Sequence, residues 1–129
     1  MSKVSWKSEP EEHDYPAATA YLSLIAVAAQ TDDLVGRLRT APVEYHKAKD
    51  ILRAAGLPLL SQDDPHVASD LRKISQNTAL SPVLLVRGDL SNGDPLQIAD
   101  GYHRVCASYH INENTDIPCH LVDRADRRG

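Results

Sequence analysis

The chain has 129 residues, with 14 Lys and Arg against 18 Asp and Glu, so its formal net charge is −4 at pH 7. Its 42% hydrophobic and 25% charged residues are typical of a globular protein and exclude a disordered chain. A chain of this length forms one domain. The acidic balance argues against a free-standing DNA-binding module, which usually carries a basic surface.

The cysteine content and the most apolar segment indicate the cellular compartment expected for this chain. Two cysteines cannot build a disulfide framework and fit a reducing compartment. The polar, acidic start of the chain shows no secretory signal. The most apolar stretch, residues 17–29, would reach roughly 20 Å as a helix and so falls short of a bilayer core of about 30 Å. We therefore expect a soluble, cytoplasmic protein that does not enter a membrane.

The N-terminal third predicts a flexible arm followed by a helical extension. Residues 1–13 are polar and are expected to form the arm, and Asp14-Tyr15-Pro16 favours a helix start. Apolar residues then recur at spacings of four, three and four, which predicts one helix face: Ala18, Leu22, Ile25 and Ala29. The other side is apolar too, so this helix packs in a core or against a second copy in a homodimer. Thr31 is expected to cap a second helix within an extension over residues 14–42.

The remaining pattern predicts an α/β (α+β) fold with a small mixed sheet. The expected strands are 43–47, 83–87, 96–99 and 118–122. Helical spacing is found over 48–55, ended by Gly56, and helices 65–76 and 102–110 are expected to cover the sheet. The residues from 88 to 95 are rich in turn formers and predict a hairpin loop. Residues 124–129 form a basic tail.

The segment most suggestive of chemistry is the glycine turn Asp100-Gly101-Tyr102-His103-Arg104. It joins an expected strand to an expected helix, whose first turn leaves backbone N–H groups unpaired and carries a partial positive charge. Glycine allows an anion to approach the backbone, and Arg104 and His103 add donors suited to phosphate. These are the parts of a phosphate cradle. Asp100 would cap the helix or bind Mg²⁺ carried by the phosphates.

With its surroundings, this turn resembles the ParB/sulfiredoxin superfamily over residues 43–123, about two thirds of the chain. The matching segments are 43–51, the helix 67–74, the Pro-then-strand element Leu80-Ser81-Pro82-Val83-Leu84-Leu85-Val86-Arg87, the turn, and the strand 117–122. ParB proteins carry Gly-Glu-Arg-Arg at the turn and sulfiredoxins carry Gly-Cys-His-Arg. The resemblance implies that Gly101, Tyr102, His103 and Arg104 face a nucleotide, ATP or CTP with Mg²⁺. Lys49 and Arg53, on one helix face, are candidates for further phosphate contacts.

Two departures from the family restrict the function that the resemblance implies. Tyr102 stands where sulfiredoxins carry their nucleophilic cysteine, and a phenol cannot replace a thiolate in sulfinic-acid reduction. Cys106 is one turn further into the helix, where a small side chain packs. The helix-turn-helix domain of ParB partition proteins has no counterpart here, so we do not expect this chain to bind a centromere or other DNA.

Two classes of function are consistent with the cradle. One is a small nucleotide-dependent phosphotransferase or hydrolase, in which Asp100 and His103 are the catalytic candidates that assist proton transfer. The other is a non-catalytic module that binds a nucleotide or another anion, and in which the N-terminal helix mediates self-association or docking to a partner protein. A third interpretation, a ParB-like nuclease, fits the acidic charge less well. We do not expect a structural metal site formed by His103, Cys106 and His110 with Cys119 or His120, because the spacing of these residues matches no known motif of paired metal ligands.

Overall fold

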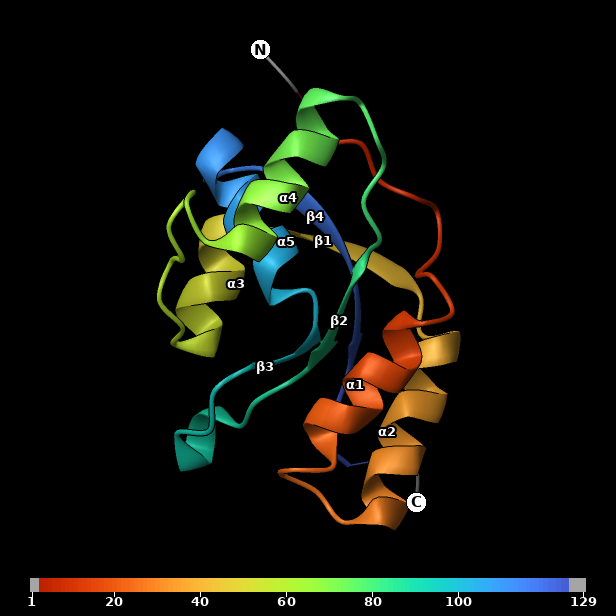
Figure 1. The fold of residues 1–129 in the computed structure, drawn as a ribbon. Helices are drawn as coiled ribbons and strands as arrows, with labels where there is room; N and C mark the ends of the chain where they lie inside the picture. Colours follow the sequence, from red (N-terminus) through yellow and green to blue (C-terminus); the bar gives the residue numbers. More distant parts are fainter. Residues whose placement is uncertain (1–2, 126–129) are drawn as a thin grey trace.

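The computed structural model describes residues 3–125 and contains one four-stranded mixed sheet covered by helices (Figure 1). The sheet has the order β1-β4-β2-β3, with β1 at Val43–Lys47, β2 at Val83–Val86, β3 at Gln97–Asp100 and β4 at Asp116–Val122. β1 pairs antiparallel with β4 and β2 antiparallel with β3, whereas β2 and β4 are parallel. The fold class predicted from the sequence, a small mixed sheet with covering helices, is confirmed. Residues 126–129 of the predicted tail lie outside the described residues.

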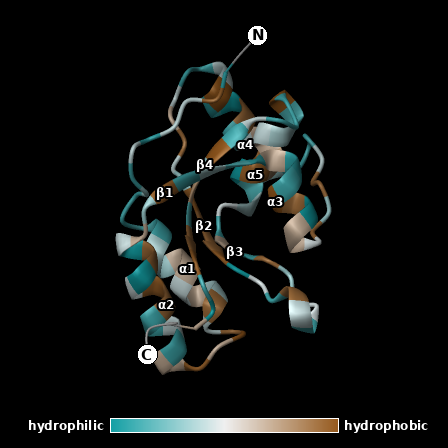
Figure 2. Ribbon diagram, turned by 180° about the vertical axis from the view of Figure 1, so that it is seen from behind, coloured by the Kyte–Doolittle hydropathy of each residue, from teal (hydrophilic) through white to brown (hydrophobic). Residues whose placement is uncertain are grey.

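Helices cover both faces of the sheet and create two hydrophobic cores. On one face lie α3 (Ala48–Ala55), α4 (Pro65–Ser75) and α5 (Tyr102–Ile111), and on the other lie α1 (Asp14–Leu22) and α2 (Ala28–Thr40). Side chains alternate across a strand, so Val83 and Leu85 of β2 enter the first core while Leu84 and Val86 enter the second. β2 is therefore hydrophobic along its whole length (Figure 2) and is the centre of the molecule.

The N-terminal helix is shorter than the sequence predicts. α1 ends at Leu22. Beyond it, the amides of Leu24 and Ile25 donate to the carbonyls three residues earlier, those of Tyr21 and Leu22, at 3.1 and 3.0 Å, in place of the carbonyls four residues earlier that an α-helix uses. The chain turns over residues 23–27 and α2 starts at Ala28, so Thr31 lies inside α2 and does not cap it. This turn allows both helices to lie on one face of the sheet. Ala18 and Leu22 are buried in the chain's own core, and self-association through this helix stays a prediction.

The N-terminal segment packs against the body of the protein, in contrast to the flexible arm expected for residues 1–13. The amide of Lys7 donates to the carbonyl of Leu80 at 2.8 Å, and the amide of Leu80 donates to the carbonyl of Ser5 at 2.8 Å. Val4 and Trp6, two residues apart on one side of this extended segment, pack against the core beneath α5. A short polar segment with two apolar residues is thereby enough to fix the chain start from residue 4.

The turn from β3 into α5 presses its backbone against β2. Gly101 has φ 113°, outside the range that side-chain-bearing residues ordinarily adopt. A Cβ at this position would lie 2.5 Å from Cγ1 and 2.9 Å from Cβ of Val83. Glycine is therefore required here both by the backbone conformation and by the close approach of α5 to the central strand.

Replacing Gly101 with alanine should destabilise the protein by about 2–4 kcal/mol, because the strained φ and the overlap with Val83 each cost about 1–3 kcal/mol. Urea unfolding would measure this loss. Gly93→Ala is the matched control: Gly93 also has a positive φ, 73°, but no atom lies within 4 Å of a Cβ built there. The control should lose only about 1–2 kcal/mol. Equal losses in the two variants would contradict the close contact with Val83.

Candidate functional site

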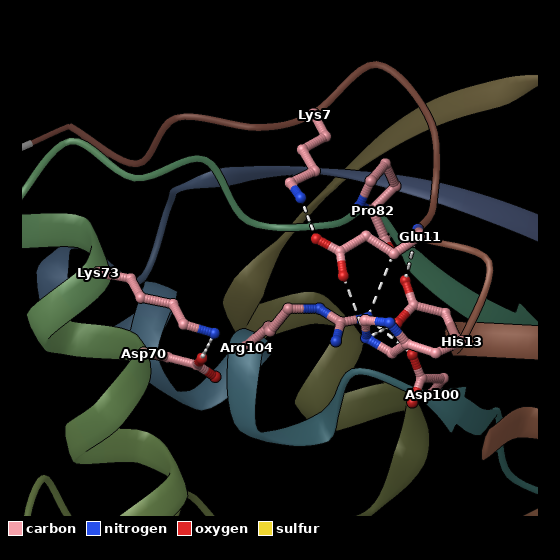
Figure 3. A network of polar contacts seen from close by, with 9 residues as sticks. Lys7, Glu11, His13, Asp70, Lys73, Pro82, Asp100 and Arg104 are labelled. Atoms are coloured by element: carbon pink, nitrogen blue, oxygen red, sulfur yellow. Dashed lines mark hydrogen bonds and ion pairs between the residues drawn. The ribbon is translucent and has the colours of Figure 1, made fainter.

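A small polar cavity of about 240 Å³ lies where the middle of α4 meets the start of α5. Its lining is almost wholly polar and comes from eight residues: His66, Ser69, Asp70, Lys73, Asp100, Gly101, His103 and Arg104. Figure 3 shows Asp70 and Lys73 on α4 facing Arg104 on α5, with Asp100 at the end of β3.

The start of α5 supplies backbone donors to this cavity. Gly101 is the N-cap and offers no side chain to the first amides of the helix. The first bond inside the helix is made by the amide of Val105, which donates to the Gly101 carbonyl at 3.0 Å. The three amides before it, those of residues 102–104, have no acceptor within the helix by its geometry. An anion in the cavity would find donors and the positive end of the helix dipole.

Arg104 is held in place by two acceptors that belong to the fold. Its Nη2 donates to Oδ2 of Asp100 at 2.9 Å and to the carbonyl of Pro82 at 3.2 Å. Both partners of the ion pair are only 17% exposed at their side chains. The Nε of Arg104 is buried and has no hydrogen-bond partner among residues 3–125. One donor of this guanidinium is thus committed, while another is unsatisfied.

Asp100 has a perturbed carboxyl because it is buried beside another acid. Burial raises its pKa above the ordinary value, and the neighbouring carboxylate of Asp14 raises it further, while Arg104 lowers it. Asp14 is itself 2% exposed and accepts a hydrogen bond from the amide of Glu11 at 3.0 Å. His13 reaches both Glu11 and Asp14, at 3.1 and 3.4 Å, and Figure 3 shows this N-terminal network beside Arg104. The N-terminal segment therefore lies beside Asp100 and Arg104, although none of its described residues lines the cavity itself.

The α4 side of the cavity carries a second perturbed carboxyl and an imidazole pair. Burial raises the pKa of Asp70, although Lys73, whose Nζ lies 3.9 Å away, partly offsets this. The rings of His66 and His103 are in contact, with centroids 4.7 Å apart. His103 also lies 4.0 Å from Asp64, the N-cap of α4. Burying a carboxyl group without a strong partner weakens the fold. Carboxyl groups with raised pKa values in a cavity are therefore characteristic of functional sites.

The structure brings some of the predicted site residues together and leaves others apart. Asp100, Gly101, His103 and Arg104 line one cavity. Tyr102 faces away from it, because its hydroxyl donates to the carbonyl of Pro58 at 2.5 Å. Lys49 and Arg53 are exposed on α3 and do not line the cavity, and Arg53 pairs with Asp50 at 3.2 Å.

Sequence reasoning missed the contribution of α4. His66, Ser69, Asp70 and Lys73 all line the cavity, and they stand three, four and seven residues apart counted from His66. This spacing is that of one helix face. The same helix was predicted from its apolar face alone, formed by Val67, Leu71 and Ile74. A search for polar residues with helical spacing would have found this second face of the helix.

Most of the residues considered as metal ligands have a structural role instead: Cys106 and Cys119 are buried, and His110 and His120 bond to backbone carbonyls. Burial raises the pKa of Cys106, and it raises that of Cys119 to about 12, so neither is a ready thiolate. His110 bonds to the carbonyl of Leu60 at 2.7 Å, and His120 bonds to that of Ala41 at 2.8 Å. Within the described part of the chain, no three His, Cys, Asp or Glu side chains are placed to hold a metal ion. The described part also holds no helix long and apolar enough to cross a membrane.

Comparison of the chain with protein-family models, with curated proteins and with solved structures found no match. The resemblance to the ParB/sulfiredoxin superfamily therefore stays a prediction.

The perturbed carboxyl of Asp70 gives a pH-dependent prediction. A carboxyl with a raised pKa contributes its full stability below its ordinary pKa of 3.8, and this contribution is lost as pH rises through the higher value of the folded state. Asp70→Asn, neutral at every pH, should therefore gain stability over the natural chain at pH 7 and lose that advantage near pH 4. Urea unfolding at both pH values measures the difference.

The carboxyl group of Asp64 should show the opposite dependence of stability on pH. Hydrogen bonds from the amides of Val67 and His66 lower its pKa, so its contribution is present at pH 7 and is lost as pH falls. Asp64→Asn should therefore be less stable than the natural chain at pH 7, with the difference shrinking in acid. A gain in stability at pH 7 for Asp64→Asn, or a loss for Asp70→Asn, would contradict the assignment of these two carboxyls.

Proposed function

We propose that this cavity binds the phosphate group of a small molecule, and that a nucleotide such as ATP or CTP is its ligand. The observation that carries the proposal is the meeting, in one polar cavity, of the amide end of α5 with the cationic side chains of Lys73 and Arg104 and two imidazoles. Backbone amides at a helix start and forked or ammonium donors are the groups that proteins use to hold phosphate.

The size of the cavity limits which part of a ligand it would hold. At about 240 Å³ it is smaller than the roughly 300–1,000 Å³ of pockets that enclose drug-sized molecules. A phosphate group fits such a space, and a nucleoside would have to lie on the surface outside it. The imidazole rings of His66 and His103 line the cavity, with their centroids 4.7 Å apart. These rings could support the remainder of the ligand.

The charges of the cavity favour a phosphate that arrives with a cation. Lys73 and Arg104 are balanced by Asp70 and Asp100, so a bare polyphosphate would add uncompensated negative charge. Carboxylate oxygens are the ligands that Mg²⁺ prefers, and in nucleotide sites this ion is held by one or two carboxylates together with the phosphates. Asp70 and Asp100 fit that role because both line the cavity. When bound, the ion would neutralise phosphate charge.

Phosphoryl transfer is a second candidate function, and Asp70 favours it. Its nearest charged partner is 3.9 Å away, and its raised pKa brings it closer to neutral pH, which is what a general acid or base requires. Of the two candidates predicted from sequence, His103 lines the cavity and lies 4.0 Å from Asp64, whereas Asp100 is bound to Arg104 at 2.9 Å. Asp70 and His103 are therefore better placed for proton transfer than Asp100.

Removing the charge of Lys73 tests the binding proposal without disturbing the core. Lys73→Gln should weaken binding of ATP with Mg²⁺, or of inorganic phosphate, by about tenfold, since a hydrogen bond to a charged group contributes about 1.5–3 kcal/mol. Arg72→Gln is the matched control, because it removes one positive charge from the same turn of α4 at an exposed position outside the cavity. The control should bind within about twofold of the natural chain.

Amide resonances of residues 101–104 provide the direct readout in a nuclear magnetic resonance titration. Phosphate or nucleotide should shift these amides, and equal ionic strength of chloride should not. Loss of affinity in both glutamine variants would indicate general charge attraction. Absence of any shift with phosphate, ATP or CTP, with or without Mg²⁺, would refute the proposal. Release of phosphate from the nucleotide, abolished by Asp70→Asn but not by Arg72→Gln, would identify the site as catalytic.

A further inference from the structure

The two edges of the sheet differ in how they are protected. At one edge, β3 is short, α1 packs against it through Tyr21 and Gln97, and a register shift interrupts its pairing with β2 next to Leu84. At the other edge, β1 contains no proline and pairs with β4 over five residues in continuous register, with Tyr45 opposite Pro118 of β4. Natural proteins usually cover, shorten or distort an edge strand, because its outer backbone groups can pair with another chain.

The register of β1 shows which of its backbone groups face outward. The amide of Ala48 donates to the carbonyl of Thr115 at 3.0 Å, which places residue 48 in a hydrogen-bonded position opposite β4. Bonded positions alternate along an antiparallel pair, so Glu44 and His46 also face β4. Val43, Tyr45 and Lys47 then point their amides away from the sheet. Within residues 3–125, no hydrogen bond from another segment reaches the outer backbone groups of Val43 and Tyr45.

The side chains of this edge are also uncovered. Tyr45 is 61% exposed and Val43 is 45% exposed, although both are residues that strands favour. Lys47, whose charge would discourage pairing, lies 4.0 Å from Asp116. The edge therefore presents free amides together with an exposed aromatic and an exposed branched side chain.

We infer that β1 is a docking edge for a second copy of this chain, with two β1 strands antiparallel and Tyr45 on the two-fold axis. In this register Tyr45 exchanges its amide and carbonyl with the partner's Tyr45, and the amide of Lys47 donates to the carbonyl of the partner's Val43. Glu44 then lies opposite the partner's His46, and the reverse pair forms at the other side of the axis. These two side chains are already compatible as neighbours, since His46 lies 2.7 Å from Glu44 within one strand.

Charge complementarity is what selects a second copy over an unrelated strand. Directly opposite residues in an antiparallel pair interact most strongly, and an acid opposite an imidazole is a favourable pair. The symmetric arrangement forms that pair twice and places the two tyrosines opposite each other. Both features come from the sequence of β1 alone. A five-residue ladder is short, so we expect a dimer that dissociates on dilution and that joins two sheets into one of eight strands.

The experiment is a mass measurement by light scattering across a dilution series of the full chain. We expect the natural chain to approach twice its mass of 14.2 kDa at high concentration. Tyr45→Lys, which sets two lysines against each other on the axis, should remain at 14.2 kDa with an unchanged thermal unfolding transition, because residue 45 is exposed. Glu44→Lys should also dissociate the dimer, and the exchanged variant Glu44→His with His46→Glu should restore it.

Leu24→Lys is the control for another exposed apolar segment, the turn between α1 and α2, where Leu24 is 82% exposed. This variant should dimerise like the natural chain. A natural chain that stays at 14.2 kDa at every concentration would overturn the inference. So would a dimer that survives Tyr45→Lys, or one that is lost in Leu24→Lys.

Discussion

The contact between the backbone of Gly101 and the side chain of Val83 determines the geometry on which the rest of the structure depends. Val83 belongs to β2, the strand buried on both faces, so its position is fixed by two hydrophobic cores. Because Gly101 has no side chain, α5 starts directly above this strand, and Arg104 in its first turn reaches the carbonyl of Pro82 at 3.2 Å. A bulkier residue would move the helix start, the guanidinium and one wall of the cavity together.

The carboxyl groups that line the cavity lower the stability of the fold. Asp70 and Asp100 are buried acids whose pKa values are raised, so their ionised forms weaken the protein at neutral pH. Asp100 is partly compensated by Arg104, but the neighbouring Asp14 raises the pKa of Asp100 further. A sequence under selection for stability alone would replace such groups with neutral residues. Their joint presence around a polar cavity fits the proposed site, in which a divalent cation that arrives with the phosphate would lie against these two carboxyl groups.

Local patterns predicted most of this fold because each element carries its own signal. Val43–Lys47, Ala48–Ala55 and the start of α4 at Pro65 appear as the sequence indicates, since Val43 and Tyr45 favour a strand, and a terminal glycine and an Asp-Pro cap act within a few residues. The prediction failed where tertiary packing decides: apolar spacing continued from Leu22 to Ala29, but the chain turns so that two helices fit on one face of the sheet. Likewise, the glycine turn was visible as a motif, whereas the polar face of α4 became part of the site only through the packing of α4 on α5.

The proposed dimer and the proposed ligand site use different parts of the sheet, and this separation follows from its topology. β1 and β3 are the two edges, and the chain leaves β3 directly into the turn that forms the cavity. The edge next to the site is therefore occupied by the helix start and by α1, and only the β1 edge remains able to accept another strand. Two copies joined at β1 would place their cavities beyond opposite ends of the strand order, so neither cavity would be covered by the partner's sheet. The central strands β4 and β2 would then connect the two sites through one continuous ladder of backbone hydrogen bonds.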